Sequence, residues 1–184
     1  MKKENSKNSV KWAVTMIALF MINVLVSGQS SVLNRQMTKF NGKGFSIEYP
    51  SNWTVDNEYG LAEALNVDAV IGGPDNEIIY FTLKKENNVD VSFEEMLEYY
   101  KQFYASKQGG SASGIKVGKY NAILSTTRIK NPESGNSMIT LIYRIKSGTV
   151  VYEFSFNLKY TSEENFKTQT TIVDKIIDSF KEIH

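Results

Sequence analysis

The alternation of apolar and polar side chains from Ile115 to Leu158 constrains the fold of this chain more than any other feature of its sequence. Its last part, Val150–Leu158, places apolar and polar residues at alternate positions, as in a strand with one buried face. Turn sequences interrupt the stretch at Gly118-Lys119, at 131–136 and at Ser147-Gly148. Because parallel strands need crossovers of a dozen or more residues, these short connections predict an antiparallel meander.

Two amphipathic helices are expected beside this meander. Ser92 and Glu95 have the spacing of a capping box, and apolar residues then recur at three- and four-residue steps as far as Tyr104. A second capped helix is expected to open at Thr161 with Glu164. Strands, a helix, a meander and a final helix follow one another, so the fold class is α+β, with helices covering an antiparallel sheet.

The N-terminal part of the domain is expected to add further strands. Asn41-Gly42 predicts a tight hairpin, because this dipeptide supplies the positive φ angles of such turns. Phe45–Tyr49 alternates as a half-buried strand that ends at Pro50, and Val67–Ile71 and Ile78–Leu83 have the composition of two more strands.

The first 28 residues have the three parts of a secretory signal peptide. Four lysines precede the apolar run Trp12–Val26, and small polar residues follow it. The run is shorter than the roughly 20 residues that span a bilayer comfortably. Cleavage after Gly28 would leave a flexible leader at 29–39, a folded domain at 40–184, and no membrane span. The protein is therefore expected to be secreted or periplasmic, with an uncleaved signal anchor as the alternative.

The charge of the mature chain argues against a nucleic-acid partner. The full chain has 21 basic and 20 acidic residues, but four lysines and one glutamate lie in the expected signal peptide, which leaves 17 against 19. No basic stripe remains to neutralise phosphates. The expected partner is an envelope protein or a small ligand.

Catalytic chemistry has little support in the residue types. The chain has no cysteine and a single histidine, His184, which excludes thiol nucleophiles, iron–sulfur clusters and metal sites that need several of these residues. No cofactor or metal is implied. Ser113 and Lys116 match the SxxK spacing of serine–lysine hydrolases, but on a strand residues three apart face opposite sides. A hydrolase that uses carboxylates or this Ser/Lys pair is the alternative to a non-enzyme.

A candidate binding site lies in the meander. If Ser147-Gly148 is a two-residue turn, Arg144 pairs with Val151 and has Glu153 as its diagonal neighbour. Arg128 is expected on the same face of an adjoining strand. Two guanidiniums and one carboxylate would form a net positive site that binds a carboxylate bidentately. The competing interpretation is a solvated face or a structural ion pair.

The run Gly44-Phe45-Ser46-Ile47-Glu48-Tyr49-Pro50-Ser51-Asn52-Trp53 resembles the opening of PsbP-like domains. The order of later elements is similar, and the resemblance covers roughly Phe40–Ile183. It implies an α-β-α sandwich around an antiparallel sheet, as in PsbP and DcrB-type envelope proteins, and supplies no catalytic motif. The lipobox cysteine of the bacterial lipoprotein members is missing here.

These features together predict an exported, non-catalytic PsbP-like binding or assembly module of the cell envelope. The alternatives are the hydrolase considered above and a signal-anchored structural envelope protein.

Overall fold

The structure is a computed structural model, and it describes residues 36–56, 61–73, 78–130 and 137–183. The expected signal peptide at 1–28 and most of the expected leader lie outside the described residues. Residues Met37–His184 form one compact unit, which is the subject of the description below. No helix in the described ranges has both the length and the apolar character needed to cross a membrane.

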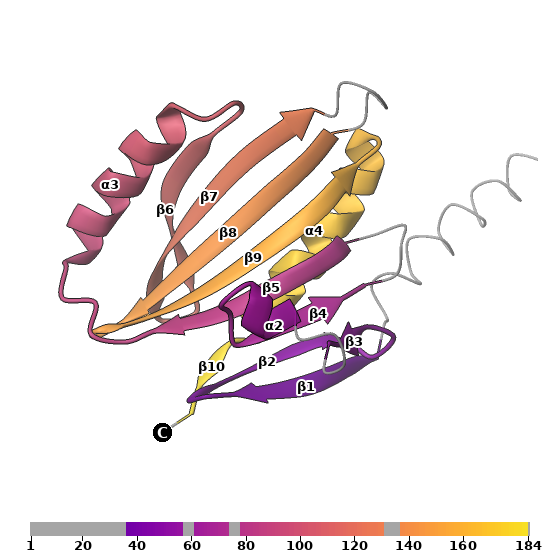
Figure 1. The fold of residues 1–184 in the computed structure, drawn as a ribbon, viewed down its shortest axis with the longest axis horizontal. Helices are drawn as coiled ribbons and strands as arrows, with labels where there is room; N and C mark the ends of the chain where they lie inside the picture. Colours follow the sequence, from indigo (N-terminus) through magenta and orange to yellow (C-terminus); the bar gives the residue numbers. More distant parts are fainter. Residues whose placement is uncertain (1–35, 57–60, 74–77, 131–136, 184) are drawn as a thin grey trace, which may run out of the picture. The chain divides into compact units, whose positions relative to one another are not determined.

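The larger sheet has seven strands within the described residues, in the order β3-β4-β5-β9-β8-β7-β6 (Figure 1). Their bounds are β3 Thr54–Val55, β4 Ala69–Gly72, β5 Ile78–Glu86, β6 Ser111–Val117, β7 Tyr120–Lys130, β8 Ser137–Ser147 and β9 Val150–Tyr160. Every neighbouring pair is antiparallel. The predicted antiparallel meander is therefore confirmed as β6-β7-β8-β9.

The register of the β8-β9 hairpin differs from the prediction. Ser147 pairs with Val150, so the two central turn residues are Gly148 and Thr149 rather than Ser147 and Gly148. Gly148 has a φ of 55°, a left-handed conformation that costs glycine little and suits the first central position of a hairpin turn. This shift places Arg144 directly opposite Glu153 instead of diagonal to it.

A smaller sheet of three described strands has the order β1-β2-β10, with bounds β1 Met37–Gly42, β2 Phe45–Pro50 and β10 Lys181–Glu182. The predicted hairpin forms, but its central residues are Lys43 and Gly44, and Gly44 has a φ of 82°. β1 begins at Met37, three residues before the expected domain start at Phe40, because Met37 already pairs with Pro50.

Three described helices accompany the sheets: α2 Leu61–Ala64, α3 Phe93–Ala105 and α4 Glu163–Asp178. The capping box of α3 is confirmed, since the Glu95 amide donates to Ser92 Oγ and the Ser92 amide donates to the Glu95 carboxylate. The N-cap of α4 is Ser162 rather than Thr161, and its hydroxyl accepts from the Asn165 amide.

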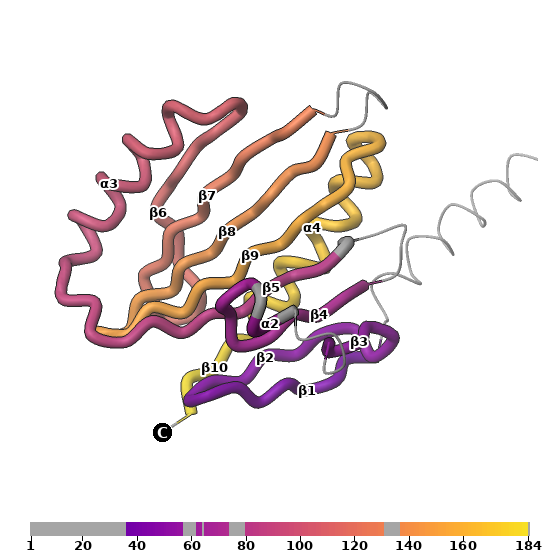
Figure 2. The backbone as a smooth tube through the Cα atoms, in the orientation of Figure 1, coloured from indigo at the N-terminus to yellow at the C-terminus, as the bar shows by residue number. Residues whose placement is uncertain are grey.

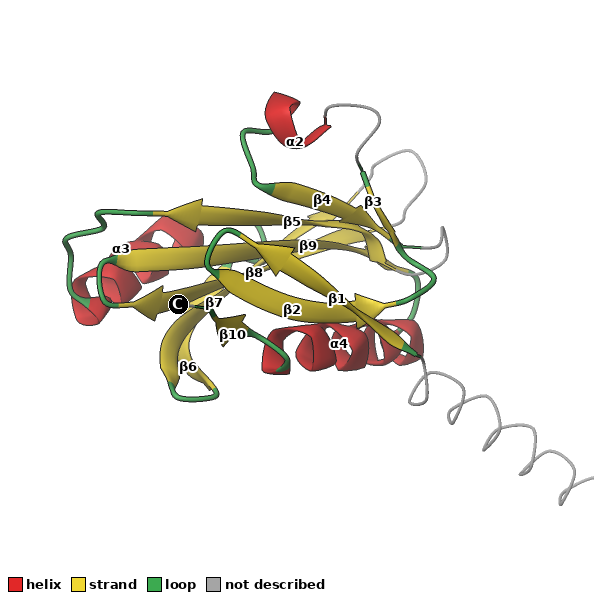
Figure 3. Ribbon diagram, turned by 90° about the horizontal axis from the view of Figure 1, so that it is seen from below, coloured by secondary structure: helices red, strands yellow, loops and turns green. Residues whose placement is uncertain are grey.

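The helices α3 and α4 cover opposite faces of the larger sheet. α4 runs along one face (Figure 3), where the Tyr143 hydroxyl donates to Asp174. α3 packs over β6 and β7 on the other face, where a Cβ at Gly114 would lie 3.2 Å from Leu97. Gly114 pairs with Ile123, and Ile123 with Arg144, so Arg144 lies on the α3 face. The predicted α+β class, with helices flanking an antiparallel sheet, is confirmed.

The connection from β5 to α3 passes the tip of the β8-β9 hairpin (Figure 2). The Val89 amide donates to the Thr149 carbonyl at 2.9 Å, and Lys146 Nζ donates to the Val89 carbonyl at 3.2 Å. These bonds hold the connection against the α3 face of the sheet.

A hydrogen-bonded cluster attaches the C-terminal strand β10 to both sheets. The Tyr152 hydroxyl donates to Glu182 Oε1 at 3.1 Å and lies 3.3 Å from the Gly44 carbonyl oxygen. The Ser147 hydroxyl donates to Glu182 Oε2 at 2.8 Å. Burial and the hydrogen bond to Glu182 raise the pKa of Tyr152 to about 12.

This raised pKa gives an expected pH dependence of stability. The folded state holds the Tyr152 proton more tightly than the unfolded state, whose tyrosine pKa is about 10. The contribution of protonated Tyr152 to the stability of the fold is therefore complete below pH 10 and is lost as the pH rises toward about 12. Urea unfolding across this range is expected to show a falling free energy of unfolding, with a shallower fall in Tyr152→Phe. Tyr99→Phe changes an exposed tyrosine and should leave the pH dependence of the free energy of unfolding as in the wild type. An equal pH dependence in all three proteins would contradict the contribution of Tyr152.

Candidate functional site

Arg144 lies at the centre of the candidate site and is 6% exposed. Its Nε is 2.8 Å from Glu153 Oε2, an ion pair without the alignment of a hydrogen bond. Nη1 donates to Ser125 Oγ at 3.2 Å, and Nη2 donates to the Tyr104 hydroxyl at 3.4 Å. The guanidinium carbon lies 3.9 Å from the centre of the Tyr100 ring. Each nitrogen of this cation therefore has a partner within the protein: an ion pair at Nε and hydrogen bonds at Nη1 and Nη2.

The electrostatic surroundings keep Arg144 charged. Burial lowers the pKa of its guanidinium, but the Glu153 carboxylate and the hydroxyls of Tyr100 and Tyr104 raise the pKa by more. Burial also raises the pKa of the Tyr100 hydroxyl, which therefore stays protonated at neutral pH. The site contains a paired cation next to a neutral aromatic ring.

Arg128 does not join this site. It pairs with Ile139 and lies five residues from Ile123, the partner of Arg144, so its side chain leaves β7 on the opposite face. There it is exposed, with its guanidinium 4.4 Å from the centre of the Tyr160 ring. The expected grouping of two guanidiniums with one carboxylate is wrong, because residues an odd number of positions apart on a regular strand face opposite sides.

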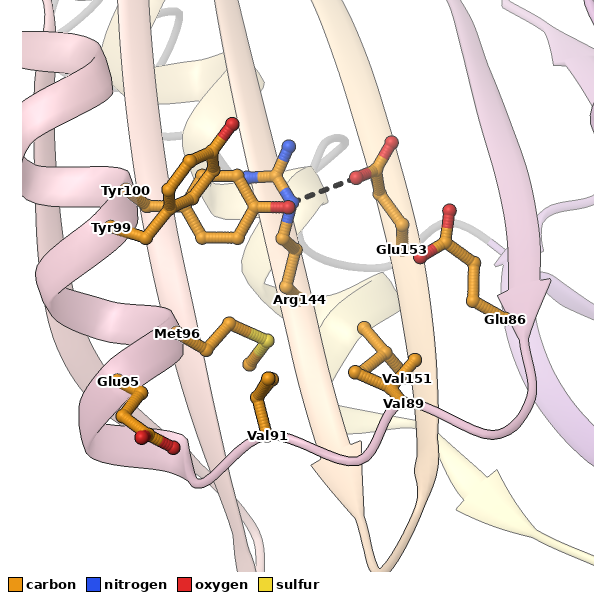
Figure 4. Close-up of a pocket in the computed structure, with 10 residues that line it drawn as sticks. All are labelled: Glu86, Val89, Val91, Glu95, Met96, Tyr99, Tyr100, Arg144, Val151 and Glu153. Carbon is orange, nitrogen blue, oxygen red and sulfur yellow. Dashed lines mark ion pairs between the residues drawn. The ribbon is translucent and has the colours of Figure 1, made fainter.

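A cavity of about 310 Å³ lies between α3, the β5–α3 connection and the sheet (Figure 4). Its lining consists of Glu86, Val89, Val91, Glu95, Met96, Tyr99, Tyr100, Arg144, Val151 and Glu153. Figure 4 shows an apolar end, at Met96, Val91 and Val151, and a polar end, where Arg144 lies between Tyr100 and Glu153. The cavity thus joins an apolar floor to a charged wall.

The helical spacing of α3 places its inner residues at this cavity. Met96 and Tyr100 are one turn apart and face the sheet, and Met96 packs with Ile123 and Val151 in a buried cluster. The stripe predicted for α3 is wrong at Phe103, which is 43% exposed. Phe103 lies two turns from Met96 on nearly the same side of the helix, and its ring stacks on the exposed Tyr99.

Apolar side chains are exposed on the same side of the molecule. Val91 is 46% exposed, Tyr99 is 60% exposed, and both line the cavity. The Tyr99 and Phe103 rings stack with centres 6.1 Å apart, which extends the apolar surface along α3. Aromatic residues at such exposed positions are typical of binding surfaces.

The Ser/Lys alternative has no supporting geometry. Ser113 pairs with Leu124 and Lys116 with Asn121, so the two side chains leave β6 on opposite faces. Lys116 Nζ donates to Asn121 instead. Ser134 and Asn136, which match the SxN spacing of the same class of enzymes, lie outside the described residues. Within the described part of the chain, no group of three or more His, Asp or Glu residues could hold a metal ion.

Several residues of the cavity were not identified from sequence. The spacing of Tyr100 and Tyr104 on one helical face was visible, but nothing indicated that these rings would contact Arg144. Glu86, Val89 and Val91 come from the end of β5 and the following connection, and their place depends on the hydrogen bonds to the β8-β9 hairpin.

Comparison with known proteins shows a shared fold. No protein-family model matches the chain, and no curated protein matches it. A crystal structure of a Bacteroides thetaiotaomicron protein has a TM-score of 0.57 and 17% identity, and the match covers 81% of this chain and 49% of that one. This chain therefore spans about half the length of that protein.

Two further structures match this chain over most of their own length. The Saccharomyces cerevisiae Ran-binding protein Mog1p has a TM-score of 0.53 and 12% identity, with 82% of this chain and 96% of that one covered. A cyanobacterial PsbP from Synechocystis has a TM-score of 0.40 and 17% identity, with 79% and 92% covered. At these identities the matches to the Bacteroides protein and to Mog1p show a shared fold and leave the function to the site.

Proposed function

We propose that this protein is a non-catalytic binding module of the cell envelope that takes its partner in the cavity beside α3. One observation carries the proposal: the buried charge of the cavity is already paired, while its apolar side chains line open space. Arg144 contacts Glu153, Ser125 and Tyr104, so its charge is engaged within the protein. Binding pockets combine such an apolar lining with a few fixed polar groups.

The shared fold agrees with a binding role. Mog1p is described as a Ran-binding protein, and its structure has the same arrangement of helices and sheet. We propose binding as the common feature and do not extend the identity of that partner to this chain. Export of the module rests on the residue pattern of 1–28, and its test is the N-terminus of the protein recovered outside the cytoplasm, expected at Gln29.

The proposed role gives an expected result for fragment binding followed by amide chemical shifts. Small apolar fragments are expected to shift the amides of α3 and of the connection at 87–92. Val91→Trp should abolish these shifts, because an indole at this position would fill the cavity mouth. Leu65→Trp is the matched control, since Leu65 is 50% exposed and does not line the cavity. Fragments that bind elsewhere, or that bind Val91→Trp equally well, would contradict the proposal.

The hydrolase alternative makes a different prediction. A fluorophosphonate should label Ser113 if that residue is an activated nucleophile. Labelling at Ser113 that is lost in Lys116→Ala would favour the hydrolase over the binding module.

A further inference from the structure

The segment Glu86–Glu98, which forms one side of the cavity, is strongly acidic. The segment Glu86–Glu98 carries five carboxylates and no lysine or arginine. All five carboxylate residues are exposed: Glu86, Asp90, Glu94, Glu95 and Glu98. Two of them, Glu86 and Glu95, line the cavity together with Glu153. The contacts of Glu95 with Ser92 lower the pKa of its carboxyl group, so it stays ionised at neutral pH.

The cations beside this wall are held by contacts within the protein. Arg144 is paired with Glu153, and Lys146 Nζ donates to the Val89 carbonyl. Lys84 lies 2.7 Å from Glu86, in a pair whose side chains are 36% and 46% exposed. An exposed pair of this kind is weak, so Lys84 can be displaced by a cation that is better placed. The residues that line the cavity therefore include three carboxylates and one guanidinium, and Lys84 beside them is held by a weak exposed pair.

The two ends of the cavity differ in chemistry, so they suit different parts of a bound side chain. Met96, Val91 and Val151 form an apolar surface that suits an aliphatic stem, and Glu86 and Glu153 lie together at the other end (Figure 4). The Tyr99 ring projects from α3 on the side of the cavity across from Glu86 and Glu153 (Figure 4), and an aromatic ring can contact a cation through its face. Lysine and arginine combine an aliphatic stem with a charged tip. The volume of about 310 Å³ is at the small end of the roughly 300–1,000 Å³ of ligand pockets, as expected for a single side chain.

We infer that the cavity receives a lysine or arginine side chain from a basic segment of a partner protein. This inference rests on the proposed binding function and names its ligand. A protein partner is favoured because Val91, Tyr99 and Phe103 extend the apolar surface beyond the cavity, and because the whole exposed segment Glu86–Glu98 is acidic. The charge of this ligand is opposite to the one expected from the sequence, where Arg128 and Arg144 together indicated a site for an anion.

Three capped peptides that differ in one type of residue test the inference. Their lysines are replaced by norleucine in the second peptide and by glutamate in the third, and binding is followed by amide shifts at low and at high salt. The lysine peptide should bind most tightly and the glutamate peptide least, and high salt should reduce the difference. Tighter binding of the glutamate peptide, or equal affinity for lysine and norleucine, would overturn the inference.

Charge variants give the second measurement. Glu86→Gln and Glu98→Gln remove exposed carboxylates and leave the α3 capping box intact. Each is expected to weaken the affinity for the lysine peptide by about twofold to fivefold. Glu164→Gln makes the same charge change on α4, which covers the opposite face, and should have no effect.

The outcomes separate this inference from the proposed function. If the norleucine peptide and apolar fragments bind in the cavity without a preference for lysine, the binding function stands and the ligand is wrong. If neither peptides nor fragments bind there, the binding function itself fails. Binding of n-butylammonium as tight as that of the lysine peptide would overturn the protein partner, since nothing beyond the side chain would then contribute.

Discussion

Replacing Phe45 with alanine is expected to lower the free energy of unfolding by about 3–5 kcal/mol. The Phe45 side chain is 1% exposed and lies between the two sheets. Its ring centre is 5.5 Å from that of Tyr152, 5.9 Å from that of Phe154 and 6.3 Å from that of Phe180. Truncation would leave a cavity at the point where β2, β9 and the end of α4 meet, and rigid neighbouring rings cannot collapse to fill it.

Urea denaturation of the purified protein measures this effect, with Phe40→Ala as the matched control. Phe40 contributes the same side chain from the neighbouring strand, with its ring centre 6.2 Å from that of Phe45, but it is only half-buried. The control should lose clearly less stability than Phe45→Ala. A cost below about 1 kcal/mol for Phe45→Ala, or equal costs for both variants, would show that this ring does not join the sheets.

Replacing Arg144 with methionine is expected to lower the free energy of unfolding by about 2–4 kcal/mol. The substitution keeps much of the side-chain volume but leaves Glu153, Ser125 and Tyr104 without their cation. Removing one partner of a buried ion pair is costly because the remaining charge stays desolvated. The Glu153 side chain is 28% exposed, so water can reach it and the cost lies below that of a fully buried pair.

Two further variants distinguish the ion pair from simple packing. Arg144→Met combined with Glu153→Gln should recover part of the loss, because no unpaired charge remains. Arg128→Met should cost less than about 1 kcal/mol, since that side chain is exposed and stacks on Tyr160 at the surface. Equal costs at Arg128 and Arg144 would contradict the placement of the two residues on opposite faces. Thermal and urea unfolding of the four proteins, wild type included, give the comparison.

The local features of this fold follow from patterns that need no knowledge of distant residues. Alternation with a period of two and short glycine turns predicted the meander, and the Ser92–Glu95 spacing predicted the beginning of α3. The helix cap depends on hydrogen bonds within four residues, and short connections allow only antiparallel neighbours. Such interactions are readable because both partners lie in the same short stretch of sequence.

The hairpin turns show where local patterns stop being sufficient. Ser147-Gly148 and Gly148-Thr149 are both reasonable two-residue turns, and the choice between them moves every cross-strand pair of β8 and β9. The structure selects Gly148-Thr149, with Ser147 paired to Val150 and hydrogen-bonded to Glu182. Contacts with the remote strand β10 therefore accompany a register that the turn sequence alone leaves open.

The sequence by itself determined the α+β class, the antiparallel meander and the capped start of α3. The tertiary structure decided the site: it paired Arg144 with Glu153, placed Arg128 on the other face, and formed the cavity from α3 and the β5–α3 connection. The physical reason is that alternation assigns side chains to two faces within one strand, whereas the register between strands and the helix above them determines which faces coincide. A binding site made from several elements depends on that second kind of information.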